Sequence, residues 1–283
     1  FPLLPRPSRL PKSLLKFDMA KAKSLATAKS PKAMIKIAMA HGLYEYGKDR
    51  HGVSLYRKAL TASAWLYDFT GDDKYKKIAV PLLQALPRIW TRWYGEHQQK
   101  PVREISSGIV ARWGDRNHYV LGLGWLVMGT QRAPYYYGIK GNGSGGSMSS
   151  LAYAFDIMAD KLSAADRKAI IDGFFVPAGI QCRNHYIGDG NQQATANVTA
   201  LYAGLAARNW PLVAYATSSE HGLDDIFTWC FEDDGVQIRK NYQTYTIRPL
   251  LWTLELLEPR GLNVYAKYAK RLERVVNANP RQK

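Results

Sequence analysis

The fold class of the chain is indicated most clearly by residues 148–175, which read MSSLAYAFDIMADKLSAADRKAIIDGFF. Residues 148–159 are rich in apolar side chains and are predicted to form a helix. Ser163 and Asp166 follow, and their spacing is that of a capping box, which satisfies free backbone groups where a helix begins. The stretch therefore predicts two helices joined by a short turn, the second one extending through Phe175.

Similar helical patterns occur on both sides of this stretch. Residues 54–69 place apolar side chains at a period near that of a helix, residues 70–73 interrupt the pattern, and a further helix is predicted over residues 74–86. Two more helices are predicted over residues 192–205 and 246–257, and alternating strand patterns are scarce. We therefore expect an all-α fold with little or no β structure. Successive helical hairpins without a short fixed repeat favour an α/α toroid, with an irregular bundle as the alternative.

The chain organisation is predicted to be simple. Four prolines within residues 1–12 indicate an extended arm, and residues 13–283 are expected to form a single toroid domain. No apolar run approaches the length of a membrane span, so we expect no membrane insertion. The first residues lack the features of a signal peptide. A mature secreted chain and a cytoplasmic chain would both look like this, and we expect a secreted or periplasmic protein.

The charge of the chain indicates the class of partner. Lysine and arginine total 39 against 23 aspartate and glutamate residues, a formal net charge of +16. Such an excess attracts polyanions. The basic residues are spread along the chain rather than gathered in a nucleic-acid tail, and no nucleic-acid motif is recognised. We expect an acidic polysaccharide partner and no nucleic acid. Among the tryptophans, Trp125, Trp93 and Trp229 are candidate platforms for sugar rings.

Three polar segments are candidates for chemistry. The first is RNHY at residues 183–186, followed by GDGNQQ at residues 188–193 just before a predicted helix. The second is EDDGVQIRKNYQTY at residues 232–245, again just before a predicted helix. The third, at residues 116–119, repeats RNHY, either by chance or because a helical hairpin is duplicated.

These residue types suit β-elimination from a uronate chain. The proton next to a carboxylate becomes acidic only when the carboxylate charge is neutralised, which Asn, Gln, protonated His or Arg can do. A Tyr or His can then take the proton, and a Tyr can protonate the leaving oxygen. Neither a metal nor a cofactor is needed, and no metal-binding motif is found, although a structural calcium is left open.

Two of the segments also resemble known lyases. NQQATANVTALYAG, residues 191–204, is similar to the loop and helix of the heparinase II/III-like and alginate lyase families, where an Asn is commonly followed by His. DDGVQIRKNYQTY, residues 233–245, resembles a loop of those families and of the hyaluronate and chondroitin lyases. The hairpin at residues 149–170 is similar too. The resemblance spans roughly residues 55–258 and implies an α/α-toroid lyase acting on alginate, glucuronan or a glycosaminoglycan.

The resemblance implies roles for individual residues. Asn191 would neutralise the substrate carboxylate, and Tyr245 would be the catalytic base or acid. Gln192 stands where many relatives have His, so His185 is the candidate imidazole. An alternative register pairs Asn184 and His185 with Tyr242. Further candidates for binding substrate are Arg183, Arg239, His118, Trp125 and Gln192.

Two other functions compete with the lyase. A glycoside hydrolase needs two carboxylic acids, which Asp189 and the acids at residues 232–234 (Glu232, Asp233, Asp234) could supply. A toroid that binds a polyanion or glycan without catalysis is the third possibility, and the glutamine at position 192 is compatible with it.

Overall fold

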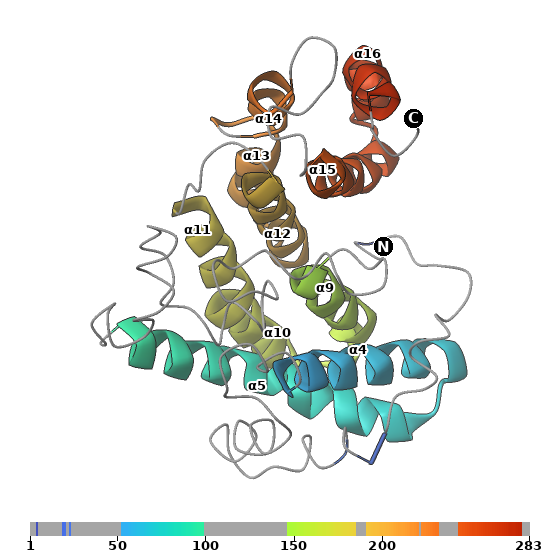
Figure 1. The fold of residues 1–283 in the computed structure, drawn as a ribbon. Helices are drawn as coiled ribbons and strands as arrows, with labels where there is room; N and C mark the ends of the chain where they lie inside the picture. The colour runs from blue at the N-terminus through green and yellow to red at the C-terminus, as the bar shows by residue number, and fades with distance from the viewer. Residues whose placement is uncertain are drawn as a thin grey trace. The chain divides into compact units, whose positions relative to one another are not determined.

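The computed structural model describes Leu4, residues 19–20, Lys23 and residues 52–98, 146–184, 191–220, 222–231 and 243–278. Of these residues 88% are helical and none lies in a strand, which confirms the all-α prediction (Figure 1). The chain divides into two compact units, Phe1–Pro177 and Ala178–Lys283. The toroid, and a single domain over residues 13–283, stay predictions.

The N-terminal unit is built from helical hairpins. Its α-helices are α4 (Gly52–Thr70), α5 (Asp73–Gln98), α9 (Gly146–Met158) and α10 (Ala164–Ile170), with a 3₁₀ turn, η3 (Ala159–Lys161), and a π-helical turn, η4 (Ile171–Phe175). Helix α4 packs on α5 and α9, and α5 packs on η4. The predicted helices are thus present. Of the predicted arm only Leu4 is described; its side chain is 1% exposed and its amide donates to Asp156 Oδ2 at 3.3 Å.

The turn between α4 and α5 forms where the sequence predicts it. Gly71 adopts φ +67°, a conformation that favours glycine, and its amide donates to the Tyr67 carbonyl at 2.8 Å. The Asp72 carboxylate then accepts a hydrogen bond from the Lys74 amide at 2.9 Å, which supports the start of α5.

Helix α5 is longer than predicted, because it continues through Pro81 and Pro87 to Gln98. A proline inside a helix removes one backbone hydrogen bond and crowds the preceding turn. The buried apolar side of α5, which includes Leu82 and Leu86, favours continuing the helix despite this cost. Opposite Pro87 lies Gly173 of η4, where an added Cβ would be only 2.7 Å from the proline Cβ. The missing side chain at position 173 makes room for the proline ring.

The hairpin of α9 and α10 confirms the capping box. The Asp166 amide donates to Ser163 Oγ at 3.0 Å, and the Ser163 hydroxyl donates to Asp166 Oδ2 at 2.7 Å. This hydrogen bond is the main reason that the pKa of Asp166 lies below its usual value, with a smaller effect from Gln84. The predicted continuous helix through Phe175 is instead α10 followed by the π-helical turn. The turn inserts one extra residue, and it brings Phe174 and Phe175 into the core with no exposed surface.

The C-terminal unit is arranged around one helix. Helix α11 (Val176–Asn184) leads into it, and α12 (Asn191–Ala207) contacts α13 (Trp210–Thr217), α14 (Leu223–Trp229) and α15 (Gln243–Leu257). Helix α15 passes through the 3₁₀ turn η6 (Glu258–Arg260) to α16 (Val264–Asn277). Helices α11, α13, α14 and α16 were not predicted from the sequence.

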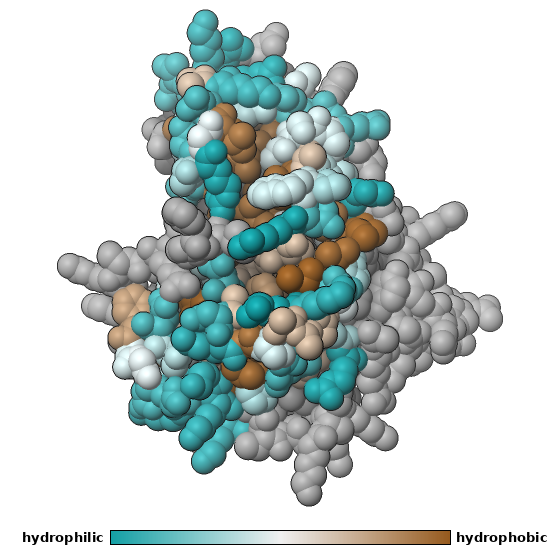
Figure 2. Space-filling model, turned by 180° about the vertical axis from the view of Figure 1, so that it is seen from behind, coloured by the Kyte–Doolittle hydropathy of each residue, from teal (hydrophilic) through white to brown (hydrophobic). Residues whose placement is uncertain are grey.

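Surface and core are divided as expected for helices that bury one side. Most of the coloured surface in Figure 2 is hydrophilic, and apolar residues show in strips between the hydrophilic ones. Helix α16 is an example, with Val264, Tyr268 and Val275 buried and its basic side chains exposed. No helix among the described residues is long and apolar enough to cross a membrane.

Asp224 joins α14 to α16. Its carboxylate accepts hydrogen bonds from Lys267 Nζ and Tyr268 Oη, both at 2.9 Å, and the Tyr268 ring stacks on Phe227 at 4.8 Å between centroids. Partial burial acts to raise the pKa of Asp224, but the hydrogen bonds from Lys267 and Tyr268, with the nearby charge of Arg271, outweigh it. The pKa of this carboxyl therefore lies below its usual value.

Replacing Ser163 with alanine removes the cap of α10. We expect Ser163→Ala to lower the free energy of unfolding by about 1 kcal/mol, the usual cost of losing a helix cap. Ser163→Thr keeps a hydroxyl and should lose much less. Chemical denaturation measures both variants, and equal stability of Ser163→Ala and the wild type would contradict the capping role.

Replacing Asp224 with asparagine tests the tie between α14 and α16. A carboxyl whose folded-state pKa is lowered stabilises the fold above its unfolded-state pKa of about 4, and this stabilisation is lost as the pH falls through the folded-state value. Asp224→Asn should therefore be less stable than the wild type at neutral pH, and the difference should shrink in acid. Urea unfolding over a pH series measures this, and a difference independent of pH would rule out the ionic contribution.

Candidate functional site

Most of the predicted site side chains lie outside the described residues. His185 and Asp189 belong to residues 185–190, and a second undescribed segment, residues 232–242, holds Arg239, Tyr242, Glu232, Asp233 and Asp234. His118 and Trp125 also lie outside the described residues. The alternative Asn184–Tyr242 register, the candidate imidazole and the acids of a hydrolase therefore stay predictions.

The structure does place the backbone of the first register. Asn191 and Gln192 are the first two residues of α12, so the predicted helix start is correct to within one residue. Helix α15 begins at Gln243, three residues before its predicted start. Tyr245 consequently lies in the first turn of α15 and not in the loop before it. Asn184 is the last residue of α11, and the neighbouring Arg183 is exposed.

Helices α12 and α15 pack directly against each other. Asn191 and Tyr245, separated by the whole of α13 and α14 in the sequence, are therefore carried by two contacting helices of one compact unit. Neither helix has an acidic residue in its first turn. The free N–H groups and the positive end of the helix dipole favour an anion at such a helix start, so the local field of both first turns is suited to a carboxylate.

A buried polar cluster holds the first turn of α12. The Gln193 side chain is fully buried, and its Nε2 donates to Asn197 Oδ1 at 2.8 Å and to Tyr215 Oη of α13 at 3.1 Å. A buried amide needs such partners, because leaving it unsatisfied costs free energy. The cluster therefore fixes the residue that follows Asn191 and Gln192 to a neighbouring helix.

Sequence reasoning missed this cluster, although a signal was present. Gln193 and Asn197 are spaced four apart in a helix otherwise rich in alanine and other apolar residues, so both lie on one helix face. Two amides on the same face of a buried helix indicate an internal hydrogen bond. The partner on α13, Tyr215, could not have been chosen among 18 tyrosines from the sequence alone.

In α15 the proline at position 249 changes the backbone near Tyr245. Pro249 is inside the helix and cannot donate to the carbonyl of the residue four positions earlier, which is Tyr245. Pro249's own carbonyl accepts a hydrogen bond from the buried Thr253 hydroxyl at 3.0 Å. The first turn of α15 thus lacks one of its regular helical hydrogen bonds at the candidate catalytic residue.

The described residues contain no group of three or more His, Cys, Asp and Glu side chains that could hold a metal ion. The predicted independence from cofactors stays a prediction.

No protein-family model matches the chain, and no curated protein sequence matches it. The resemblance to polysaccharide lyases therefore rests on the motifs at residues 191–204 and 233–245.

The role of the buried cluster can be tested at Tyr215. We expect Tyr215→Phe to lower the free energy of unfolding by about 1 kcal/mol, because it removes one acceptor from a buried amide. Tyr265→Phe is a matched control, since the Tyr265 hydroxyl has no hydrogen-bond partner among the described residues and its loss should change stability little. Denaturant unfolding of both variants measures the difference, and equal effects at the two positions would contradict the proposed contact.

Proposed function

We propose that this protein is a polysaccharide lyase that cleaves a uronate-containing acidic polysaccharide by β-elimination. The observation that carries the proposal is the direct packing of α12 on α15, the helices whose first turns contain Asn191, Gln192 and Tyr245. These are the residues for which the sequence motifs imply roles in elimination. Alginate, glucuronan and glycosaminoglycans are the substrate classes that the resemblance suggests.

Electrostatics support an acidic substrate. The chain carries a formal net charge of +16, which raises the encounter rate with polyanions. The first turns of α12 and α15 contain no acidic side chain that would repel a carboxylate. Arg183, exposed at the end of α11, is available to bind a carboxylate in two-point geometry.

The proposed reaction begins with proton transfer. A uronate carboxylate accepts hydrogen bonds from the Asn191 amide, assisted by Gln192, and its neutralisation makes the proton on the adjacent carbon acidic. The phenolate of Tyr245, or the imidazole of His185, takes that proton. The electron pair left on carbon is delocalised into the carboxylate.

Elimination follows from this intermediate. The electron pair forms a carbon–carbon double bond, and the bond from the next ring carbon to the glycosidic oxygen breaks. The leaving oxygen receives a proton from the Tyr245 hydroxyl, so the same residue can serve as base and acid. The products are a chain with an unsaturated uronate at its new end and a chain with a new reducing end. No electrons are gained or lost overall.

The proposal is tested by ultraviolet absorbance of the conjugated uronate formed from alginate, glucuronan, hyaluronan, chondroitin and heparan. We expect the wild type to produce this absorbance on at least one polymer. Tyr245→Phe should lower the rate by about 10²- to 10⁴-fold, the usual contribution of a general acid–base. Asn191→Ala should lower it by about 10²- to 10³-fold, as expected for a group that stabilises developing negative charge.

The controls separate the alternatives. Tyr265→Phe should retain the wild-type rate, and circular dichroism should show that every variant keeps its helix content. Activity that survives Tyr245→Phe and is lost in Tyr242→Phe would move the site to the Asn184–Tyr242 register. New reducing ends without the absorbance would replace the lyase with a hydrolase.

A further inference from the structure

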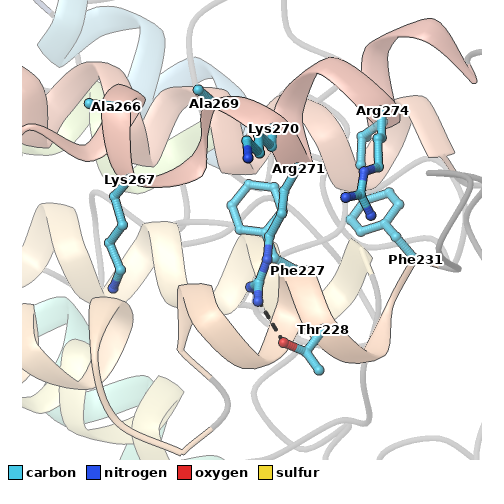
Figure 3. Close-up of a pocket in the computed structure, with 10 residues that line it drawn as sticks. Phe227, Thr228, Phe231, Ala266, Lys267, Ala269, Lys270, Arg271 and Arg274 are labelled. Atoms are coloured by element: carbon cyan, nitrogen blue, oxygen red, sulfur yellow. Dashed lines mark hydrogen bonds between the residues drawn. The ribbon is translucent and has the colours of Figure 1, made fainter.

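A groove lies between α14 and α16 of the C-terminal unit (Figure 3). Its volume is about 700 Å³, within the range of sites that hold small molecules or several sugar rings. The apolar part of the lining comes from Phe227, Phe231, Val275, Ala266 and Ala269. Four basic side chains of α16 also line the groove, and we call this set the basic row: Lys267, Lys270, Arg271 and Arg274.

The spacing of the basic row places all four charges along one side of a helix. The positions follow the intervals of three and four residues at which helical side chains are neighbours. From Lys267 to Arg274 the row extends about 10 Å along the axis of α16. Figure 3 shows Lys267, Arg271 and Arg274 extending from α16 toward α14. A linear anion lying in the groove would meet several cations in succession.

The carboxylate of Asp224 in α14 interacts with two members of the basic row, Lys267 and Arg271. Asp224 pairs with Lys267 at 2.9 Å, at one end of the row. Among the described residues no carboxylate lines the groove, since neither Asp225 nor Glu273 contributes to it. Arg271 Nη1 lies 3.5 Å from the hydroxyl of Thr228, a neutral group at the limit of hydrogen bonding. The described lining of the groove thus contains four basic side chains and no acidic one.

We infer that the groove between α14 and α16 binds an acidic polysaccharide through its carboxylate or sulfate groups, separately from the elimination site. The inference rests on the proposed function only for the class of ligand, an acidic polysaccharide. Arginine presents a planar pair of donors that matches a carboxylate or sulfate, and lysine adds a point charge. A site of this kind would hold the chain while the first turns of α12 and α15 act elsewhere along it.

The lining favours a sugar chain over a nucleic acid that binds by base stacking and over insertion into a membrane. Single-stranded nucleic acids bind by stacking bases on accessible aromatic rings. Phe227 is only 5% exposed and Phe231 only 7%, so neither offers a face for a base. Insertion into a membrane surface needs large apolar side chains that protrude into the lipid, whereas the large apolar side chains of the groove are buried and its exposed ones are alanines. A hydrophilic chain with regularly placed anionic groups fits a recessed row of cations.

The test compares two variants that lose the same charge. The groove variant is Lys270→Gln with Arg271→Gln and Arg274→Gln, and the control is Lys74→Gln with Lys77→Gln and Lys168→Gln, three exposed lysines of the N-terminal unit. Both are made in the full chain carrying Tyr245→Phe, so that the ligand is not consumed. Fluorescence anisotropy with labelled alginate and heparin fragments, over a salt series, reports affinity. The first probe carries only carboxylates, and the second adds sulfates.

We expect the groove variant to weaken binding of at least one probe by about tenfold or more, with a smaller salt dependence because fewer counterions are released. The control should change the affinity by less than about threefold. Equal losses in the two variants would overturn the inference, because binding would then follow total charge. A single-stranded oligonucleotide that binds more tightly than either polysaccharide, with the same sensitivity to the groove variant, would overturn it in favour of nucleic acid.

The outcome is independent of the elimination assay. Binding that depends on the groove, with no elimination on any polymer, would sustain the inference and refute the proposed function. Elimination together with binding that does not depend on the groove would support the proposed function and refute the inference. Circular dichroism and unfolding of the groove variant exclude a general loss of structure.

Discussion

The burial of α12 is the constraint on which the C-terminal unit depends. Its described side chains from residue 193 to 206 are almost completely enclosed, and α13, α14 and α15 all contact it. Alanines and Gly204 let the neighbours approach closely: a Cβ at Gly204 would lie 3.0 Å from the backbone nitrogen of Val213. Since water is excluded, the polar side chains of α12 need partners inside the protein, which Gln193 finds in Asn197 and Tyr215.

The same burial positions the residues of the proposed site. A helix that is packed on several sides and held by buried hydrogen bonds has little freedom to rotate or slide. The backbone position of its first residues is therefore fixed. Helix α16 is more exposed and contributes basic side chains that solvent can reach. The proposed elimination site and the proposed holding groove thus use different properties of one unit, rigid placement in the first and accessible charge in the second.

The sequence predicted the features that local physics determines. Gly71 and Ser163 mark a helix end and a helix start by their own conformational and hydrogen-bonding preferences, and both predictions are confirmed. The full length of α5 was not predictable, because its second half packs against residues that are distant in the sequence, as Pro87 does against Gly173. The short helices α13 and α14 depend on packing against α12. Likewise the starts of α12 and α15 were predicted to within three residues, but which tyrosine contacts Gln193 was not.

The fit between Pro87 and Gly173 has an evolutionary consequence. Adding any side chain at position 173 would bring its Cβ to 2.7 Å from the Cβ of residue 87, and every residue except glycine carries a Cβ at position 87. Replacing the proline by another residue with a side chain therefore does not make room at position 173. Among descendants of this sequence, position 173 should stay glycine, whereas position 87 can vary more freely.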